Sequence, residues 1–322
     1  MIEYILGIDT SAYTTSVALT DFNTGKIIAD KRRVLNVPSG HKGLRQQDAV
    51  FQHLRNFSKL YEEIEAGLKN IKVVSVSSKP RNVEGSYMPV FTVGQNYGKT
   101  IAKTLRCKYV EYSHQENHIA ASLINNYKEI KDHILAVHMS GGTTEFLKVK
   151  KAVKGYDTVI VGGSMDITFG QLIDRIGILM GFPFPCGMHM EKYLMDNLVY
   201  ENIKLPAISG KSYINLSGME NFYKKLYFSE KYSKCSLINS LFQYVADCIF
   251  HIINHIKLNY CFDIVIITGG VASNGLIRNY VGEKLNNEYN VIFPEKKNSS
   301  DNAVGVSFLP IIDRWYNEIK TN

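Results

Sequence analysis

The chain has 322 residues, enough for two domains with substantial cores, and we find no signal peptide and no apolar run long enough to span a bilayer. We therefore expect a cytoplasmic protein with no membrane partner. Five scattered cysteines without a C-x-x-C pair argue against a disulfide framework and a zinc ribbon, and a net charge of +7 is compatible with a polyanionic partner such as RNA.

The first expected elements form a hairpin. Residues 5–11 form an apolar strand that ends in small polar residues, and residues 16–19 return as a second strand. Residues 134–147 repeat the same order of apolar, Ser and Thr-Thr positions. This repeat predicts a duplicated α/β lobe with a cleft between the copies, and its turns can cradle a phosphate. For either hairpin alone, an ordinary turn is the simpler interpretation.

The segment between the hairpins predicts a mixed α/β lobe. We expect a helix over 48–64, a strand over 71–76, a loop over 78–85, a helix that includes 97–102 and a strand over 109–112. Lys99 follows Gly98, but the G-x-x-x-x-G-K spacing of a P-loop is absent.

A pair of histidines follows this lobe. Ser113 has Glu116 three residues later, the capping-box spacing that begins a helix. His114 and His118 then lie one turn apart on one face, where both imidazoles could bind one ion. Gln115 replaces the Glu of a zinc-protease H-E-x-x-H motif, which disfavours that class. The alternative is two unrelated histidines, and a metal site needs a third ligand from elsewhere.

The second half begins with a helix over 168–176, which must end before Pro183 and Pro185. We interpret residues 200–232 as a loop-rich insertion and 236–258 as a long apolar helix. His251 and His255 repeat the four-residue spacing. The run around them is so apolar that we interpret both, together with Asp247, as structural.

The C-terminal part carries two further candidate sites. The strand over 262–268 ends in Gly269-Gly270 before a helix, an arrangement that can hold an adenosine or a phosphate, and Asn274 could contact a ribose or a base. Residues 299–303 should open the last helix. Asp301 there is either an N-cap or the ligand that His114 and His118 lack.

Taken together, six motifs resemble those of the tRNA N6-adenosine threonylcarbamoyltransferase family, formerly called O-sialoglycoprotein endopeptidases or glycoproteases. They are His114-x-x-x-His118, Met139–Gly142, Gly170 with Asp174, Pro185–Gly187 with Glu191, Gly269–Asn274 and Ser300–Ala303. The resemblance implies an α/β, actin/Hsp70-like (ASKHA) fold of two RNase-H-like lobes around a nucleotide cleft. We expect one lobe over 1–110, completed by the helix 305–322, and the other over 111–304, with a loop-rich or helical insertion around 188–235.

The resemblance also implies the site. One divalent metal, iron or zinc, would be held by His114, His118 and Asp301, which would be catalytic through it. ATP or an adenylate would contact a larger set of residues. These are Asp9, Ser11, His138, Met139, Ser140, Gly141, Gly142, Asp174, Gly187, Glu191, Gly269, Gly270 and Asn274.

The implied reaction moves a threonylcarbamoyl group from its adenylate to N6 of an adenosine in tRNA, with sister subunits of a threonylcarbamoylation complex as further partners. Three segments depart from the family pattern: Ala12–Thr15, Lys79–Gly85 and Thr143. They leave two alternatives open. One is a paralogous carbamoyltransferase with another acceptor, and the other is a non-catalytic nucleotide-binding partner protein.

Overall fold

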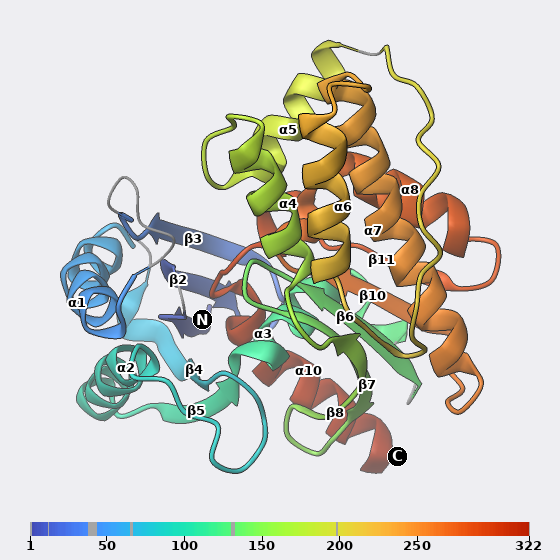
Figure 1. Cartoon of the computed structure of the whole chain (residues 1–322). Coiled ribbons are helices and arrows are strands. Elements are labelled where there is room, and N and C mark those ends of the chain that lie inside the picture. Colours follow the sequence, from blue (N-terminus) through green and yellow to red (C-terminus); the bar gives the residue numbers. More distant parts are fainter. Residues whose placement is uncertain are drawn as a thin grey trace. The chain divides into compact units, whose positions relative to one another are not determined.

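The structure is a computed structural model that describes residues 2–11, 13–37, 44–64, 67–129, 133–197 and 199–321. Ala12, part of one departure from the family pattern, lies outside these residues. The chain forms two compact units (Figure 1). Unit 1 comprises Met1–Asp132, Lys150–Asp157 and Pro294–Asn322, and unit 2 comprises His133–Val149 and Thr158–Phe293.

Unit 1 is built on a five-stranded sheet in the order β3-β2-β1-β4-β5. Its strands are β1 (Tyr4–Asp9), β2 (Thr14–Asp21), β3 (Ile27–Val34), β4 (Ile71–Lys79) and β5 (Lys108–Ser113). β1, β2 and β3 are antiparallel neighbours, whereas β1, β4 and β5 are parallel. The hairpin expected at the start of the chain is confirmed, with Asp9 paired to Ser16.

Helices cover both faces of this sheet (Figure 1). They are α1 (Gln46–Glu62), α2 (Phe91–Leu105), α3 (His114–Leu123), α9 (Lys296–Ser299) and α10 (Val304–Thr321), with short 3-10 turns η1 (Leu68–Asn70) and η2 (Tyr127–Glu129). A Cβ on Gly7 would lie 2.7 Å from Cβ of Ser307 in α10, and one on Gly94 of α2 would lie 3.3 Å from Ile8. Gly7 and Ile8 thus face opposite helices. Because side chains alternate along a strand, Asp9 points to the α10 side with Gly7.

The last helix begins later than expected. Residues 299–303 precede α10, and Asp301 is not its N-cap. Oδ1 of Asn302 accepts hydrogen bonds from the backbone N–H of Val304 at 2.9 Å and of Gly305 at 3.2 Å, so Asn302 caps the helix instead. The carboxylate of Asp301 is therefore left for other partners.

Unit 2 is built on a six-stranded sheet in the order β11-β10-β6-β7-β8-β9. Its strands are β6 (Ile134–Met139), β7 (Thr144–Lys151), β8 (Tyr156–Ser164), β9 (Tyr213–Ile214), β10 (Ile264–Thr268) and β11 (Asn290–Ile292). β6 pairs antiparallel with β7 and parallel with β10. The second expected hairpin is confirmed, with Met139 paired to Thr144.

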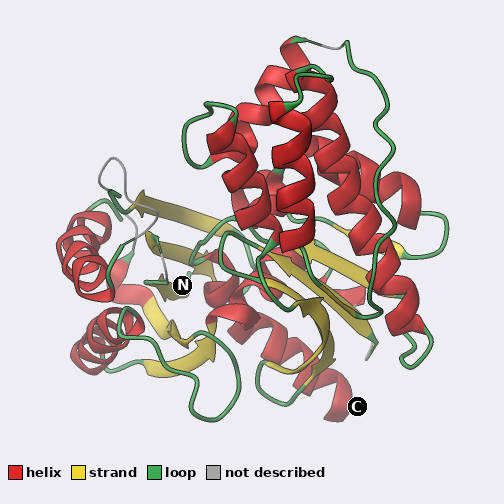
Figure 2. Ribbon diagram, viewed as in Figure 1, coloured by secondary structure: helices red, strands yellow, loops and turns green. Residues whose placement is uncertain are grey.

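The helices of unit 2 pack together as a cluster (Figure 2). They are α4 (Phe169–Leu179), α5 (Cys186–Asp196), α6 (Ser217–Phe228), α7 (Lys234–Lys257) and α8 (Gly275–Leu285), with a 3-10 turn η3 (Gly270–Ser273). The stretch over 200–232 is not irregular throughout, because α6 forms within it as the helical part of the expected insertion. Met219 and Tyr223 of α6 are buried in the core, so packing stabilises a helix there.

Two other expectations differ from the structure. α7 is long and apolar enough to cross a membrane by length and composition, contrary to our reading of the sequence, but 78% of its apolar window is buried within the protein, as in a core helix. We expect residues 111–304 to form the second lobe, but three segments of this range, 111–132, 150–157 and 294–304, belong to unit 1. These segments join unit 1 because α3 packs against α10 and Tyr156 bonds to Glu116.

Candidate metal centre and nucleotide-binding turns

The N-terminus of α3 is fixed by the capping box that the sequence predicts. Oγ of Ser113 accepts a hydrogen bond from the backbone N–H of Glu116 at 3.2 Å, and Oε2 of Glu116 accepts one from the backbone N–H of Ser113 at 2.7 Å. Oε1 of Glu116 also accepts from the backbone N–H of Tyr156 at 2.9 Å. α3 therefore begins directly at the end of β5 with a defined orientation.

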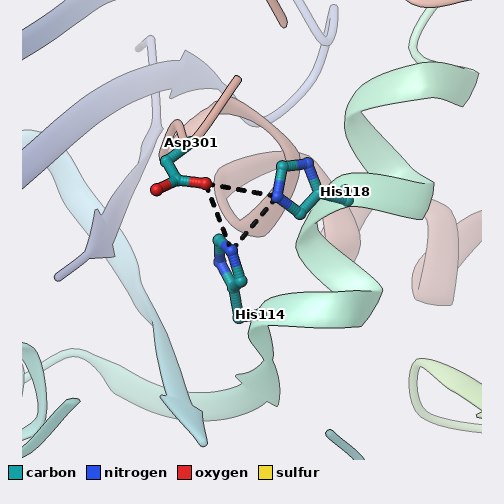
Figure 3. A group of neighbouring side chains, drawn as sticks. All are labelled: His114, His118 and Asp301. Carbon is teal, nitrogen blue, oxygen red and sulfur yellow. Dashed lines mark hydrogen bonds and ion pairs between the residues drawn. The ribbon is translucent and has the colours of Figure 1, made fainter. Parts of the chain in front are cut away.

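Three side chains expected at the metal meet in unit 1. His114 and His118 of α3 point toward the carboxylate of Asp301 (Figure 3). The two Nε2 atoms are 3.1 Å apart, and Oδ1 of Asp301 lies 3.5 Å from each. One ligand atom from each residue falls within 4.8 Å of the others, and no other such group occurs within the described ranges. Two imidazoles and one carboxylate are a donor set that suits zinc or iron and leaves further coordination positions open.

The charges of this triad are coupled. Burial raises the pKa of Asp301, but hydrogen bonds from His114 and His118 outweigh it and hold this pKa well below its usual range. Burial lowers the pKa of His114, yet the charges of Asp9 and Asp301 raise it to about 10. Burial and the charge of His114 lower the pKa of His118. At a pKa of about 10, the His114 ring carries a proton on each nitrogen at neutral pH, and a cation at Nε2 would have to replace one of them.

A second carboxylate lies behind His114. Oδ2 of Asp9 is 2.9 Å from Nδ1 of His114, and Oδ1 of Asp9 accepts hydrogen bonds from the hydroxyl of Ser11 and, at 2.9 Å, from its backbone N–H. We expect Asp9 and Ser11 to contact the nucleotide; in the structure they bond to each other, and Asp9 also bonds to His114. A carboxylate on the far ring nitrogen fixes the tautomer of a metal-binding histidine, so this arrangement fits a metal at Nε2.

Sequence reasoning missed this contact between Asp9 and His114. The available signal was an acidic residue at the carboxyl end of a buried strand. Its partner could be identified only once α3 was placed beside that strand.

The end of β6 and the turn that leads into β7 carry five of the expected nucleotide-binding residues: His138 and Met139 lie in the strand, and Ser140, Gly141 and Gly142 lie in the turn. The backbone N–H of Ser140 donates to the carbonyl of Thr143 at 2.8 Å, and space around Gly141 and Gly142 is open. α4 begins against this turn, because a Cβ on Gly170 would lie 2.5 Å from the carbonyl oxygen of Ser140. The turn thus combines exposed backbone with a nearby helix N-terminus, as anion sites do.

Gly269 and Gly270 lie beside the same turn. Gly269 has a φ of +100°, and a Cβ there would lie 2.1 Å from the carbonyl oxygen of Met139, so only glycine fits. Gly270 has open space around it. This close approach places η3 against the carboxyl end of β6.

The remaining expected residues connect the N-termini of α5 and α8. Asp174 accepts from the backbone N–H of Cys186 and Glu191 from that of Gly275, each at 2.8 Å. Asn274 caps α8 through the backbone N–H of Ile277 at 3.0 Å, and its Nδ2 lies 3.5 Å from the carbonyl of Gly187. Unit 2 therefore brings Asp174, Gly187, Glu191 and Asn274 to neighbouring helix ends, where each polar side chain already has a protein partner.

The second histidine pair does not converge on a site. Nε2 of His251 lies 3.0 Å from the carbonyl of Gly210, and Nδ1 of His255 lies 2.9 Å from the carbonyl of His251. Asp247 pairs with Lys284 at 2.8 Å. All three residues thus have structural partners, which agrees with our interpretation of this helix.

Comparisons with known proteins place this geometry in context. A family model described as "TsaD: tRNA N6-adenosine threonylcarbamoyltransferase" matches residues 46–308. The chain is 28% identical over 317 residues to a tRNA N6-adenosine threonylcarbamoyltransferase of Malacoplasma penetrans, covering 95% of this chain and 97% of that protein.

Solved structures extend the comparison to the fold. HypF of T. kodakarensis matches with a TM-score of 0.59 and 14% identity over 98% of this chain and 48% of HypF. The activator of 2-hydroxyisocaproyl-CoA dehydratase from Clostridium difficile matches with a TM-score of 0.55 and 14% identity over 99% of this chain and 98% of the activator. These likenesses confirm the expected actin/Hsp70-like fold.

Proposed function

Because the chain belongs to the tRNA N6-adenosine threonylcarbamoyltransferase family, we propose that it transfers a threonylcarbamoyl group from threonylcarbamoyl-adenylate to N6 of an adenosine in tRNA. One observation carries the proposal: two histidines and an aspartate from distant parts of the chain converge within 4.8 Å. Sister subunits of a threonylcarbamoylation complex are part of the proposal as partners.

The metal centre would lie in unit 1. Nε2 of His114, Nε2 of His118 and Oδ1 of Asp301 would hold one divalent ion, iron or zinc, and the bound ion would supply Lewis-acid polarisation of the carbamate carbonyl. Asp9 would keep the remaining imidazole proton on Nδ1 of His114, which leaves the Nε2 lone pair for the ion. The adenylate is already an activated acyl donor, so no side-chain nucleophile is needed.

Adenylate binding would fall to unit 2. The open backbone at Gly141, Gly142 and Gly270 and the N-termini of α4 and α8 offer N–H groups and positive helix-end potential to a phosphate. Asn274 has its Oδ1 engaged as a helix cap, while its Nδ2 donates to the carbonyl of Gly187 at 3.5 Å and would offer its second N–H to a ribose or base. In this proposal Asp174 and Glu191 position the ends of α5 and α8 rather than contact the ligand.

The test is a transfer assay with threonylcarbamoyl-adenylate, unmodified tRNA and any sister subunits, followed by nucleoside mass spectrometry. The wild-type chain should form the modified adenosine, and His118→Ala should lose it. His251→Ala, which removes a histidine of equal spacing outside the site, is the matched control and should retain activity. Adenylate binding without product in the wild type would support a non-catalytic partner protein instead, and product on another acceptor would support a paralogous carbamoyltransferase.

A further inference from the structure

Asn117 lies on α3 between His114 and His118 and is completely buried. Its Nδ2 donates to Oδ2 of Asp9 at 3.0 Å and to the backbone carbonyl of Asn302. Its Oδ1 accepts from the backbone N–H of Val306 at 2.6 Å. The side-chain amide of Asn117 thus bonds to β1, to the segment before α10 and to α10 itself, through its two N–H donors and its carbonyl acceptor. This pattern also fixes the amide orientation, because the flipped group would face two acceptors with oxygen.

Each of these partners leads to the triad. Asp9 binds Nδ1 of His114 through the same Oδ2 that accepts from Asn117. Asn302 directly follows Asp301 in the segment 300–303 between α9 and α10, which we call the Asp301 loop. The bond from Asn117 to the carbonyl of Asn302 therefore joins this loop to α3. Val306 lies in the first turn of α10, the helix that this loop leads into.

The Asp301 loop has its own internal bonds. Nδ2 of Asn302 donates to the carbonyls of Asn298 at 3.1 Å and Ser300 at 2.8 Å, and its Oδ1 caps α10. Asn302 therefore maintains the loop's shape, while Asn117 determines its place on α3. α10 approaches so closely that a Cβ on Gly305 would lie 1.9 Å from the carbonyl oxygen of Asn117. A displaced loop would therefore move Asp301 relative to both imidazoles.

We propose that Asn117 is a positioning residue of the metal centre, which sets the distance between the Asp301 carboxylate and the two imidazoles and orients Asp9 on His114. The inference rests on the proposed metal centre, but it concerns a residue that does not ligate the ion. The amide of Asn117 donates one hydrogen bond to the charged Asp9 and another to the neutral carbonyl of Asn302, and it accepts a third from Val306. Asp at the same position would have the right shape but would lose both donors and repel Asp9.

The test is cobalt(II) binding by Asn117→Ala and by the isosteric Asn117→Asp, with affinity from competition titration and geometry from the visible absorption of the bound ion. The matched control is Ser75→Ala. Oγ of Ser75 donates to the carbonyl of Val306 at 2.6 Å, so this variant also removes a buried bond that anchors α10, but it contacts neither Asp9 nor the Asp301 loop.

Both Asn117 variants should bind cobalt about 10- to 100-fold more weakly and with an altered spectrum, as for other residues that support metal ligands. Ser75→Ala should lose thermal stability with cobalt affinity within about twofold of wild type. Wild-type affinity and spectrum in Asn117→Asp, with stability lowered as in Ser75→Ala, would show a merely structural role and overturn the inference. Absence of cobalt binding by the wild type would instead overturn the metal centre itself.

Discussion

Oδ2 of Asp9 and Nδ1 of His114 lie 2.9 Å apart, although 105 positions separate them in the chain. β1 brings the carboxylate to the end of the sheet, and the capping box of α3 brings the imidazole to meet it. The contact keeps a proton on Nδ1 of His114, so the second ring proton, on Nε2 toward Asp301, is the one that a metal would displace. A metal-binding histidine in this setting is more basic than a free one and has a fixed ring orientation.

Substitution of Asp9 should therefore weaken metal binding without touching a ligand. We expect Asp9→Asn to lower zinc affinity about 10- to 100-fold, because a neutral amide neither polarises His114 nor fixes its tautomer. A competition titration with a chromophoric chelator measures this. Asp21→Asn is the control, since Asp21 only caps the turn after β2 through the backbone N–H groups of Asn23 and Thr24. Equal affinities for the two variants would contradict the role of Asp9.

Metal affinity should rise with pH. Although burial lowers the pKa of His114, Asp9 and Asp301 raise it to about 10, so a metal must displace one proton at neutral pH. The pKa of His118 is lowered by burial and by His114, so this ring contributes no second proton. We expect zinc affinity to increase about tenfold per pH unit between pH 7 and 9. Calorimetry in buffers of different ionisation enthalpy should find one proton released, and release of none would contradict the charge assignment.

His53 should make unit 1 sensitive to acid. This side chain of α1 is buried against Thr15, with Nδ1 2.9 Å from the threonine hydroxyl. Burial lowers its pKa to about 4, although the charges of Asp9 and Asp301 oppose this. In the unfolded chain the pKa of His53 is near 6.5, so the unfolded state takes up the proton first as the pH falls. The contribution of the neutral, buried His53 to stability is therefore complete above pH 6.5 and is lost as the pH decreases toward 4.

The expected loss is about 3 kcal/mol of unfolding free energy between these pH values. Urea unfolding at pH 7 and pH 4.5 measures it. In His53→Gln the difference between the two pH values should shrink by most of this amount, whatever the variant's stability at pH 7. An unchanged pH difference would mean that His53 takes up its proton in the folded state.

Gly305 should tolerate no side chain. A Cβ there would lie 1.9 Å from the carbonyl oxygen of Asn117. Because this oxygen belongs to the backbone of α3, the clash could be relieved only by moving α3 away from α10. We expect Gly305→Ala to destabilise the protein by about 3 kcal/mol or more. Gly282→Ala in α8 is the matched control, because its Cβ would meet only the side chain of Asn286 at 3.2 Å. That variant should be neutral or more stable by up to about 1 kcal/mol in thermal unfolding, since Ala favours helix over Gly.

Local features of this protein could be predicted from sequence, because their determinants are neighbours in the chain. The hairpins and the cap at Ser113 follow from alternation and from a three-residue spacing. α6 could not be predicted in the same way, since its polar and aromatic sequence becomes helical through tertiary packing of Met219 and Tyr223.

For the candidate site, spacing alone locates the histidine pair, whereas the sequence around Asp301 suits a helix cap as well as a ligand, and only the structure assigns the cap to Asn302. The contacts of Asp9 and Asn117 depend on where β1, α3 and α10 meet. No spacing in the sequence encodes that meeting point.

The discontinuity of unit 1 has a consequence for biosynthesis. His114 and His118 leave the ribosome nearly 200 residues before Asp301, and all of unit 2 is translated in between. A nascent chain at that stage therefore presents only two of the three proposed ligands, and α10, which packs on β1, follows after Asp301. In the proposed function, the full ligand set would exist only after translation has passed residue 301, which would tie loading of the centre to completion of unit 1.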